Sequence, residues 1–121
     1  MDENAQFILK NIEKHHELFS TSLPMIASEN LISPLARQML LSDFCDRYAE
    51  GEPGKRYYQG NAFVDEVERK TVELAKELFK APYADVRPIS GAVANLGVLF
   101  AFAKPGDNVT VVELSEGGHI S

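Results

Sequence analysis

Side chains able to bind a ligand or move a proton are concentrated in one short stretch. Residues 48–58 read YAEGEPGKRYY and place three tyrosines and two cations around a Pro-Gly turn. Loops held on a rigid scaffold carry a large share of binding residues, so aromatic hydroxyls on a turn favour ligand contact. The alternative is structural, because tyrosine often packs through its ring and leaves its oxygen in water.

Glu50 is the acid–base candidate in this stretch. Burial beside the neighbouring tyrosines would favour the protonated carboxyl, since desolvation penalises the charge, and a carboxyl of that kind can exchange protons with a substrate. A solvated glutamate on a loop is the alternative. The residue types leave both interpretations open.

Further candidates lie where strands and helices are expected to meet. Ser90-Gly91-Ala92 would present free amides and the positive end of a helix to a phosphate, with Gly91 allowing close approach. Serine is also a favoured N-cap, so a capped helix without a ligand explains the motif equally well. His119 follows two glycines and could lay its ring on a planar ligand, or be a loop histidine without a role.

Composition argues against several classes of partner. Twelve basic and eighteen acidic residues give a net charge of -6, which disfavours nucleic acid and anionic membrane surfaces. We expect neither a membrane span nor a secretory signal, and hence a cytoplasmic protein. Cys45 is the only cysteine and is expected to be a small buried side chain. His15 and His16 are adjacent, a spacing unsuited to chelation, so no metal site is expected.

Apolar periodicity predicts the helices that would position these residues. An amphipathic helix is expected over 7–19, and a second, capped by Ser33 with Pro34 in its first turn, is expected to run through Phe44. A third spans 64–78 and stops near Lys80. Residues 92–103 are almost wholly apolar, which predicts a helix buried on most of its faces.

A short extended segment and a β-branched segment predict strands. Residues 85–89 and 109–114 flank the apolar helix and complete a βαβ unit, which needs further strands to form a stable sheet. The last residues leave the carboxyl end of the second strand, where α/β sheets build their sites. The sequence therefore indicates an α/β domain and the amino-terminal part of a larger protein.

Five motifs occur in a fixed order and spacing: Ile26–Asn30, Tyr48–Gly51 with Pro53–Tyr58, Ser90-Gly91 with Ala94-Asn95, Lys104–Asp107 and Gly117–His119. Together they resemble the serine hydroxymethyltransferase family. The resemblance covers nearly the whole chain after Ile12, and the sequence of residues 85–91 is most similar to archaeal members.

The resemblance implies a pyridoxal-phosphate-dependent transferase of the aspartate-aminotransferase-like fold, fold type I. Residues 1–33 would be an N-terminal helix and arm, and residues 34–121 the start of the large, cofactor-binding domain with an incomplete sheet. The implied activity is the interconversion of serine and glycine in one-carbon metabolism and amino-acid biosynthesis. The one-carbon unit would pass to a reduced pterin, either tetrahydrofolate or a tetrahydromethanopterin-type analogue.

The resemblance also implies roles for individual residues, with Glu50, Tyr58 and His119 as the catalytic set. The family works as a homodimer or larger assembly whose site is shared between subunits. Cofactor contacts would come from Ser90, Gly91 and Ala92 on the phosphate, from Tyr48 on the phosphate in the neighbouring subunit, and from His119 on the pyridine ring. Substrate and pterin contacts would come from Ser28, Glu50, Tyr57, Tyr58, Leu114 and Gly118.

Departures from the family pattern matter for activity. The lysine that forms the internal aldimine, and the arginine that binds the substrate carboxylate, would lie beyond Ser121, so this chain alone is expected to be inactive. Gln59 stands where many members have glycine, and Glu116 where many have histidine, which adds negative charge near the pterin. Alternatives are another lyase of the same fold, such as a threonine aldolase, and a noncatalytic dimerisation or binding module.

Overall fold

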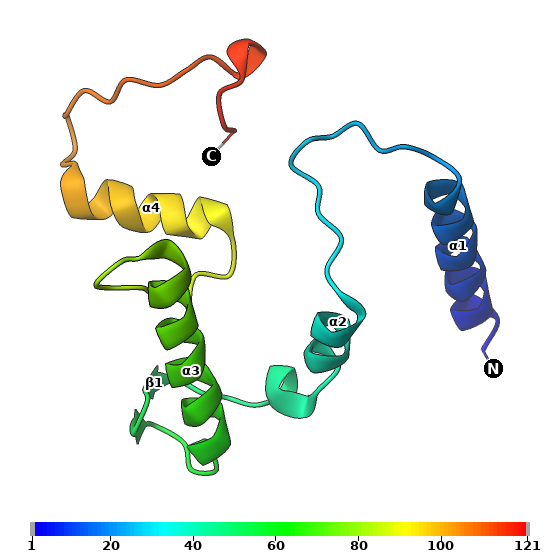
Figure 1. The fold of residues 1–121 in the computed structure, drawn as a ribbon, viewed down its shortest axis with the longest axis horizontal. Coiled ribbons are helices and arrows are strands. Elements are labelled where there is room, and N and C mark those ends of the chain that lie inside the picture. The colour runs from blue at the N-terminus through cyan, green and yellow to red at the C-terminus, as the bar shows by residue number, and fades with distance from the viewer. Residues whose placement is uncertain (1, 121) are drawn as a thin grey trace. The chain divides into compact units, whose positions relative to one another are not determined.

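The computed structural model describes residues 2–120, an α/β arrangement of four α-helices and one two-stranded sheet within that range (Figure 1). The chain divides into two compact units, one ending at Cys45 and the other beginning at Asp46. The proposed division after residue 33 stays a prediction.

Both helices of the first unit begin at side-chain caps. Helix α1 spans Glu3–Ser20, and the Asp2 carboxylate accepts the Ala5 N–H at 3.2 Å. Helix α2 spans Pro34–Leu40, and the Ser33 hydroxyl oxygen accepts the Ala36 N–H at 3.2 Å. The predicted cap and first-turn proline of α2 are therefore confirmed.

The predicted extension of α2 to Phe44 is wrong. The amides of Leu41 and Ser42 donate to carbonyls three residues back, which tightens the last turn, and a short 3-10 helix η1 follows at Asp43–Asp46. Cys45 is exposed rather than buried, and its thiol donates to the Ser42 carbonyl at 3.0 Å.

The second unit opens with a hairpin and a long helix. Strands β1, Gly51–Glu52, and β2, Lys55–Arg56, pair antiparallel around Pro53-Gly54. Gly51 has φ 98°, and a Cβ added there would lie 2.6 Å from the Lys55 carbonyl oxygen, so this position requires glycine. Helix α3, Ala62–Phe79, ends at the left-handed residue Lys80, close to the predicted end.

Helix α4, Gly91–Phe102, follows the predicted apolar segment. The Ser90 hydroxyl oxygen accepts the Val93 N–H at 3.3 Å and caps the helix. A turn ends it, because the Asp107 carboxylate accepts the Lys104 N–H at 2.8 Å. Both boundaries agree with the sequence prediction.

The two predicted strands are not formed. Within residues 2–120, segments 85–89 and 109–114 make no sheet ladder, and a short 3-10 helix η2, Leu114–Glu116, begins at the end of the second segment. A parallel strand exists only through hydrogen bonds to neighbouring strands, and neither segment pairs with a strand in the part of the chain that the structure describes. The βαβ unit, and the sheet edge expected to gather site residues, are absent from the described residues.

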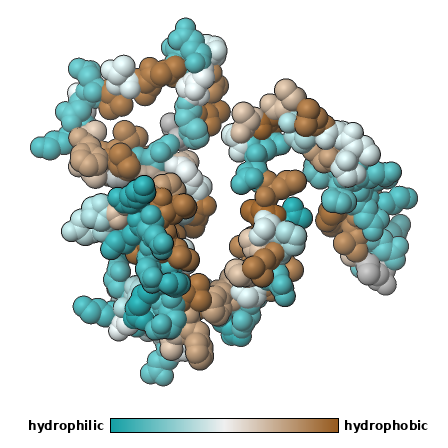
Figure 2. All heavy atoms as spheres, viewed as in Figure 1, coloured by the Kyte–Doolittle hydropathy of each residue, from teal (hydrophilic) through white to brown (hydrophobic). Residues whose placement is uncertain are grey.

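Apolar side chains lie on the surface of both units. Among residues 2–120 no hydrophobic side chain is buried, and Figure 2 shows brown apolar residues interleaved with polar ones on the visible face. Helix α4 was predicted to be buried, yet Phe100 is 84% and Phe102 is 87% exposed. The buried residues of this range are two polar ones on α3 and its N-cap, Asp65 and Asn61.

No helix within residues 2–120 combines the length and the apolar character that crossing a bilayer requires.

We predict that this chain by itself self-associates and melts without a sharp transition. Its described residues expose apolar faces and form no apolar core that would make unfolding cooperative. Light scattering after size exclusion, combined with thermal circular dichroism, tests this. A monomer with a cooperative melt would contradict the prediction.

Candidate functional site

The tyrosine-rich hairpin is attached to α3 through one arginine. The Arg56 side chain is only 6% exposed, and its Nε donates to Asp65 Oδ1 at 2.7 Å while Nη2 donates to Glu68 Oε2. The second oxygen of Asp65 accepts the Gly54 N–H at 2.6 Å. A single carboxylate on α3 therefore binds both the turn and the second strand of the hairpin.

The same guanidinium holds the backbone around Glu50. Arg56 Nη1 donates to the Ala49 and Gly51 carbonyl oxygens, both at 2.6 Å. The Glu50 carbonyl oxygen accepts the Tyr57 N–H at 3.1 Å. The Glu50 residue itself is exposed, so these hydrogen bonds hold the backbone of an exposed residue.

Asn61 brings the ends of the tyrosine-rich stretch together. Its Nδ2 donates to the carbonyl oxygens of Tyr48 and Tyr58, each at 3.1 Å. The two tyrosine rings lie with their centroids 5.4 Å apart at an interplanar angle of 31°. Tyr57, which lies between Arg56 and Tyr58 in the sequence, is 80% exposed.

Charge pairing perturbs the groups that hold the hairpin. The hydrogen bond from Arg56 holds the pKa of Asp65 below its usual range, and the Gly54 amide adds to this effect against the cost of burial. The hydrogen bonds to Glu68 and Asp65 raise the pKa of Arg56. Both groups are therefore charged, and the charged form of each stabilises the other.

A second arginine connects the hairpin to the segment that precedes α4. Arg87 Nη1 lies 2.7 Å from Glu52 Oε1, and its guanidinium binds both oxygens of Asp85. Hydrogen bonds from Arg87 lower the pKa of Asp85 to about 2. These groups are more than half exposed, so solvent screening makes the ion pairs weak.

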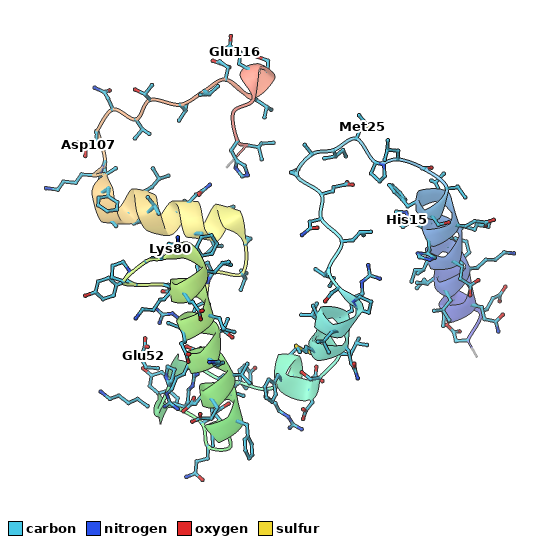
Figure 3. The ribbon with its side chains drawn as sticks, in the orientation of Figure 1. His15, Met25, Glu52, Lys80, Asp107 and Glu116 are labelled. Carbon is cyan, nitrogen blue, oxygen red and sulfur yellow. The ribbon has the colours of Figure 1, made fainter. Side chains whose placement is uncertain are left out.

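A cleft of about 340 Å³ lies beside this connection. Glu52 lines it together with Glu68 and Arg69 of α3, and Figure 3 shows Glu52 beside the lower half of α3. Val72, Asp85 and Arg87 also contribute to its walls. The cleft carries charges of both signs, unlike the apolar pockets typical of small-molecule sites.

The start of α4 can receive an anionic group. The Ser90 hydroxyl and carbonyl oxygens accept the amides of Val93 and Ala94, whereas the Gly91 and Ala92 amides have no acceptor within the helix. A Cβ added to Gly91 would meet nothing within 4 Å, so this end of the helix is open. Free amides and the helix dipole fit a phosphate group.

The other predicted site residues lie on turns. Leu114 opens η2, and the half-buried Gly118 donates its N–H to the Glu113 carbonyl oxygen at 2.9 Å. A Cβ on Gly118 would collide with the carbonyl oxygen of Val112, so glycine lets His119 leave this turn. Ser28 belongs to the first unit, on an exposed turn.

The structure therefore gathers one part of the predicted site. The hairpin and the hydrogen bonds of Asn61 and Arg56 bring together the backbone of four predicted site residues: Tyr48, Glu50, Tyr57 and Tyr58. The sheet edge expected to bring Ser90 and His119 together is not formed in residues 2–120, because segment 109–114 has no paired strand.

Sequence reasoning missed the residues that hold the hairpin. A carboxylate in the first turn of a helix, such as Asp65 in α3, is favoured by the helix dipole alone and gives no sign of a partner elsewhere in the chain. Three polar residues recur at helical spacing and form a polar stripe on one face: Asn61, Asp65 and Glu68. Arg56 binds the two carboxylates of this stripe, and Asn61 binds the Tyr58 carbonyl oxygen. This polar stripe is the sequence feature that could have indicated a binding partner for α3.

These features describe an α/β chain whose hairpin carries the acid–base candidate Glu50 and whose helix α4 begins at open amides. Comparison with known proteins specifies the family. The family model described as Serine hydroxymethyltransferase matches residues 1–121. The chain is 54% identical over 119 residues to the serine hydroxymethyltransferase of Methanopyrus kandleri, covering 98% of this chain and 28% of that protein. It is 48% identical over 121 residues to that of Methanocella arvoryzae, covering 100% of this chain and 29% of that protein.

The chain belongs to the serine hydroxymethyltransferase family. The resemblance drawn from the five motifs is thereby confirmed. The chain spans somewhat more than a quarter of the length of these relatives, 28% and 29%.

Acid is expected to release the hairpin turn from Asp65. Because the folded-state pKa of this carboxyl lies below its ordinary value of 3.8, its charge stabilises the fold in full above that value. The contribution is lost as pH falls through the lowered pKa. In the full-length protein labelled with 15N-glycine, the Gly54 amide signal should move upfield with a midpoint below 3.8.

The Asp65→Asn variant identifies the Gly54 signal and serves as the control, since its amide oxygen does not titrate in this range. A midpoint at or above 3.8 would contradict the pairing with Arg56.

Proposed function

We propose that this chain forms part of a serine hydroxymethyltransferase that interconverts serine and glycine and passes the one-carbon unit to a reduced pterin. The observation that carries the proposal is the hairpin, in which Arg56 binds the carbonyl oxygens on both sides of Glu50 and the rings of Tyr48 and Tyr58 contact each other. Membership of the family supports the same activity. A pure interaction module would have no physical need for this arrangement.

We propose that the second unit contributes to the large domain of a fold-type-I enzyme. The apolar surface of α4 and the β-branched segment 109–114 both lack the neighbours that such a sheet provides. Residue Val111, for example, is 80% exposed. Pairing of this segment with further strands would bury these side chains and place His119 at the carboxyl edge of the sheet.

Pyridoxal phosphate is the cofactor of this proposal, and when bound it supplies the electron sink for the reaction. Ser90, Gly91 and Ala92 would hold its phosphate, for which the open amides at the start of α4 are suited. His119 would stack on the pyridine ring, and Tyr48 would reach the phosphate of the neighbouring subunit.

The remaining residues would bind substrate and move a proton. Glu50 would hold or accept the proton of the substrate hydroxyl, with Tyr57 and Tyr58 beside it. Ser28 would bind the substrate carboxylate. Leu114 and Gly118 would line the pterin site, where tetrahydrofolate or a tetrahydromethanopterin-type cosubstrate would bind close to Glu116.

We propose a homodimer as the working assembly. Helix α1 carries an apolar stripe with Phe7, Ile8 and Ile12 each more than half exposed, which is the type of surface that a second subunit covers. The hairpin would reach the partner's site across the interface. Sedimentation of the full-length enzyme tests this assembly, and a monomer at working concentration would contradict it.

Glu50→Gln in the full-length enzyme should reduce serine cleavage by roughly 10²-fold or more while leaving the cofactor absorbance intact, because the amide cannot exchange the proton. Steady-state turnover and the absorbance spectrum measure the two effects. Glu52→Gln is the matched control on the same hairpin, since it removes only an exposed ion pair with Arg87. Unchanged turnover in Glu50→Gln would remove the acid–base assignment.

Ser90→Ala should weaken cofactor binding as well as the start of α4. The lost cap costs about 1 kcal/mol of helix stability, and the phosphate also loses a hydroxyl contact. Titration of pyridoxal phosphate into the cofactor-free enzyme measures the dissociation constant. Ser33→Ala removes the equivalent cap of α2 and should lower stability alone; equal cofactor affinity in both variants would refute the phosphate site.

A further inference from the structure

The backbone on both sides of Glu50 is bound by one nitrogen of a single side chain. Arg56 Nη1 reaches the carbonyl oxygens of Ala49 and Gly51, both at 2.6 Å. Rotation of the peptide groups around Glu50 would break one or both of these bonds. The direction in which the Glu50 side chain leaves the backbone is therefore set by Arg56.

The guanidinium is itself immobilised from the opposite side. Its Nε and Nη2 donate to Asp65 and Glu68, which lie one turn apart on α3. The side chain is 6% exposed, so water does not compete for these bonds. A planar fork with donors in fixed directions can bind two carboxylates and two carbonyls at once, which a lysine ammonium on a flexible stem cannot reproduce.

We propose that Arg56 is a positioning residue for the reaction, acting through Glu50. The proposal rests on the proposed proton-transfer role of Glu50. Arg56 would transmit the rigidity of α3 to the Glu50 backbone and keep the carboxyl within reach of the substrate hydroxyl. Misplacement of a reacting group by about 1 Å can cost about 10²-fold in rate.

A double-mutant cycle in the full-length holoenzyme tests the proposal. Arg56→Lys should lower kcat for serine cleavage by about 10-fold or more, with KM and the cofactor spectrum unchanged. In the Glu50→Gln background the same substitution should cost no further activity, because there is no proton-transferring group left to position. An equal fold-loss in both backgrounds, or full activity of Arg56→Lys, would overturn the proposal.

Arg69→Lys is the matched control. Arg69 lies on the same helix and also approaches Asp65, at 3.7 Å, but its side chain is 50% exposed. This variant should keep the activity of the unsubstituted enzyme. A loss equal to that of Arg56→Lys would mean that any exchange of arginine for lysine beside Asp65, rather than loss of the Arg56 hydrogen bonds to the Ala49 and Gly51 carbonyl oxygens, explains the effect, and would overturn the proposal.

Hydrogen exchange provides a readout that does not depend on turnover. Amides of residues 48–58 should exchange faster in Arg56→Lys than in Arg69→Lys, and unchanged protection would overturn the proposal. Asp65→Asn provides a second route if Arg56→Lys does not fold, because it removes the charge that orients the guanidinium and keeps an acceptor for Gly54. Full turnover of Glu50→Gln alone would instead overturn the proposed function, which distinguishes the two failures.

Discussion

The ion pair between Arg56 and Asp65 is the interaction on which the site depends. It closes a network in which one carboxylate binds the hairpin turn and one guanidinium binds the backbone around Glu50. Charge-assisted bonds of this kind are short and directional, so they define an orientation as well as a contact. Loss of Arg56 would leave the largely buried Asp65 carboxylate with only the half-exposed Arg69 at 3.7 Å, which costs more stability than loss of an exposed pair.

In the second unit, polar groups are hydrogen-bonded within the unit, whereas apolar side chains remain exposed. Polar groups near the start of α3 are satisfied within the unit, and Asn61 and Asp65 are the residues buried there. Apolar groups of α4 and segment 109–114 have no such partners in residues 2–120. The hairpin region is therefore structurally defined by short-range hydrogen bonds, whereas the α4 region depends on burial against further elements.

The same division separates the two halves of the proposed active site. Glu50, Tyr48 and Tyr58 are positioned by bonds to residues at most thirteen positions away in the chain. The helix start at Ser90, where the cofactor phosphate is proposed to bind, forms locally, because a helix start needs only its own cap. His119 is not positioned locally in this way. In the proposed fold its place relative to Ser90 depends on a sheet that residues 2–120 do not form.

The sequence by itself determined the features that depend on neighbouring residues: the caps at Ser33 and Ser90, the end of α3 at Lys80, and the motifs that indicate the family. These follow from side-chain chemistry within one turn of the backbone. Only the tertiary structure decided that Arg56 selects Asp65 and Glu68, because helical spacing shows a polar stripe but not its partner. It also decided that segments 85–89 and 109–114 are not strands here, since a strand is defined by hydrogen bonds to another strand and not by its own residues.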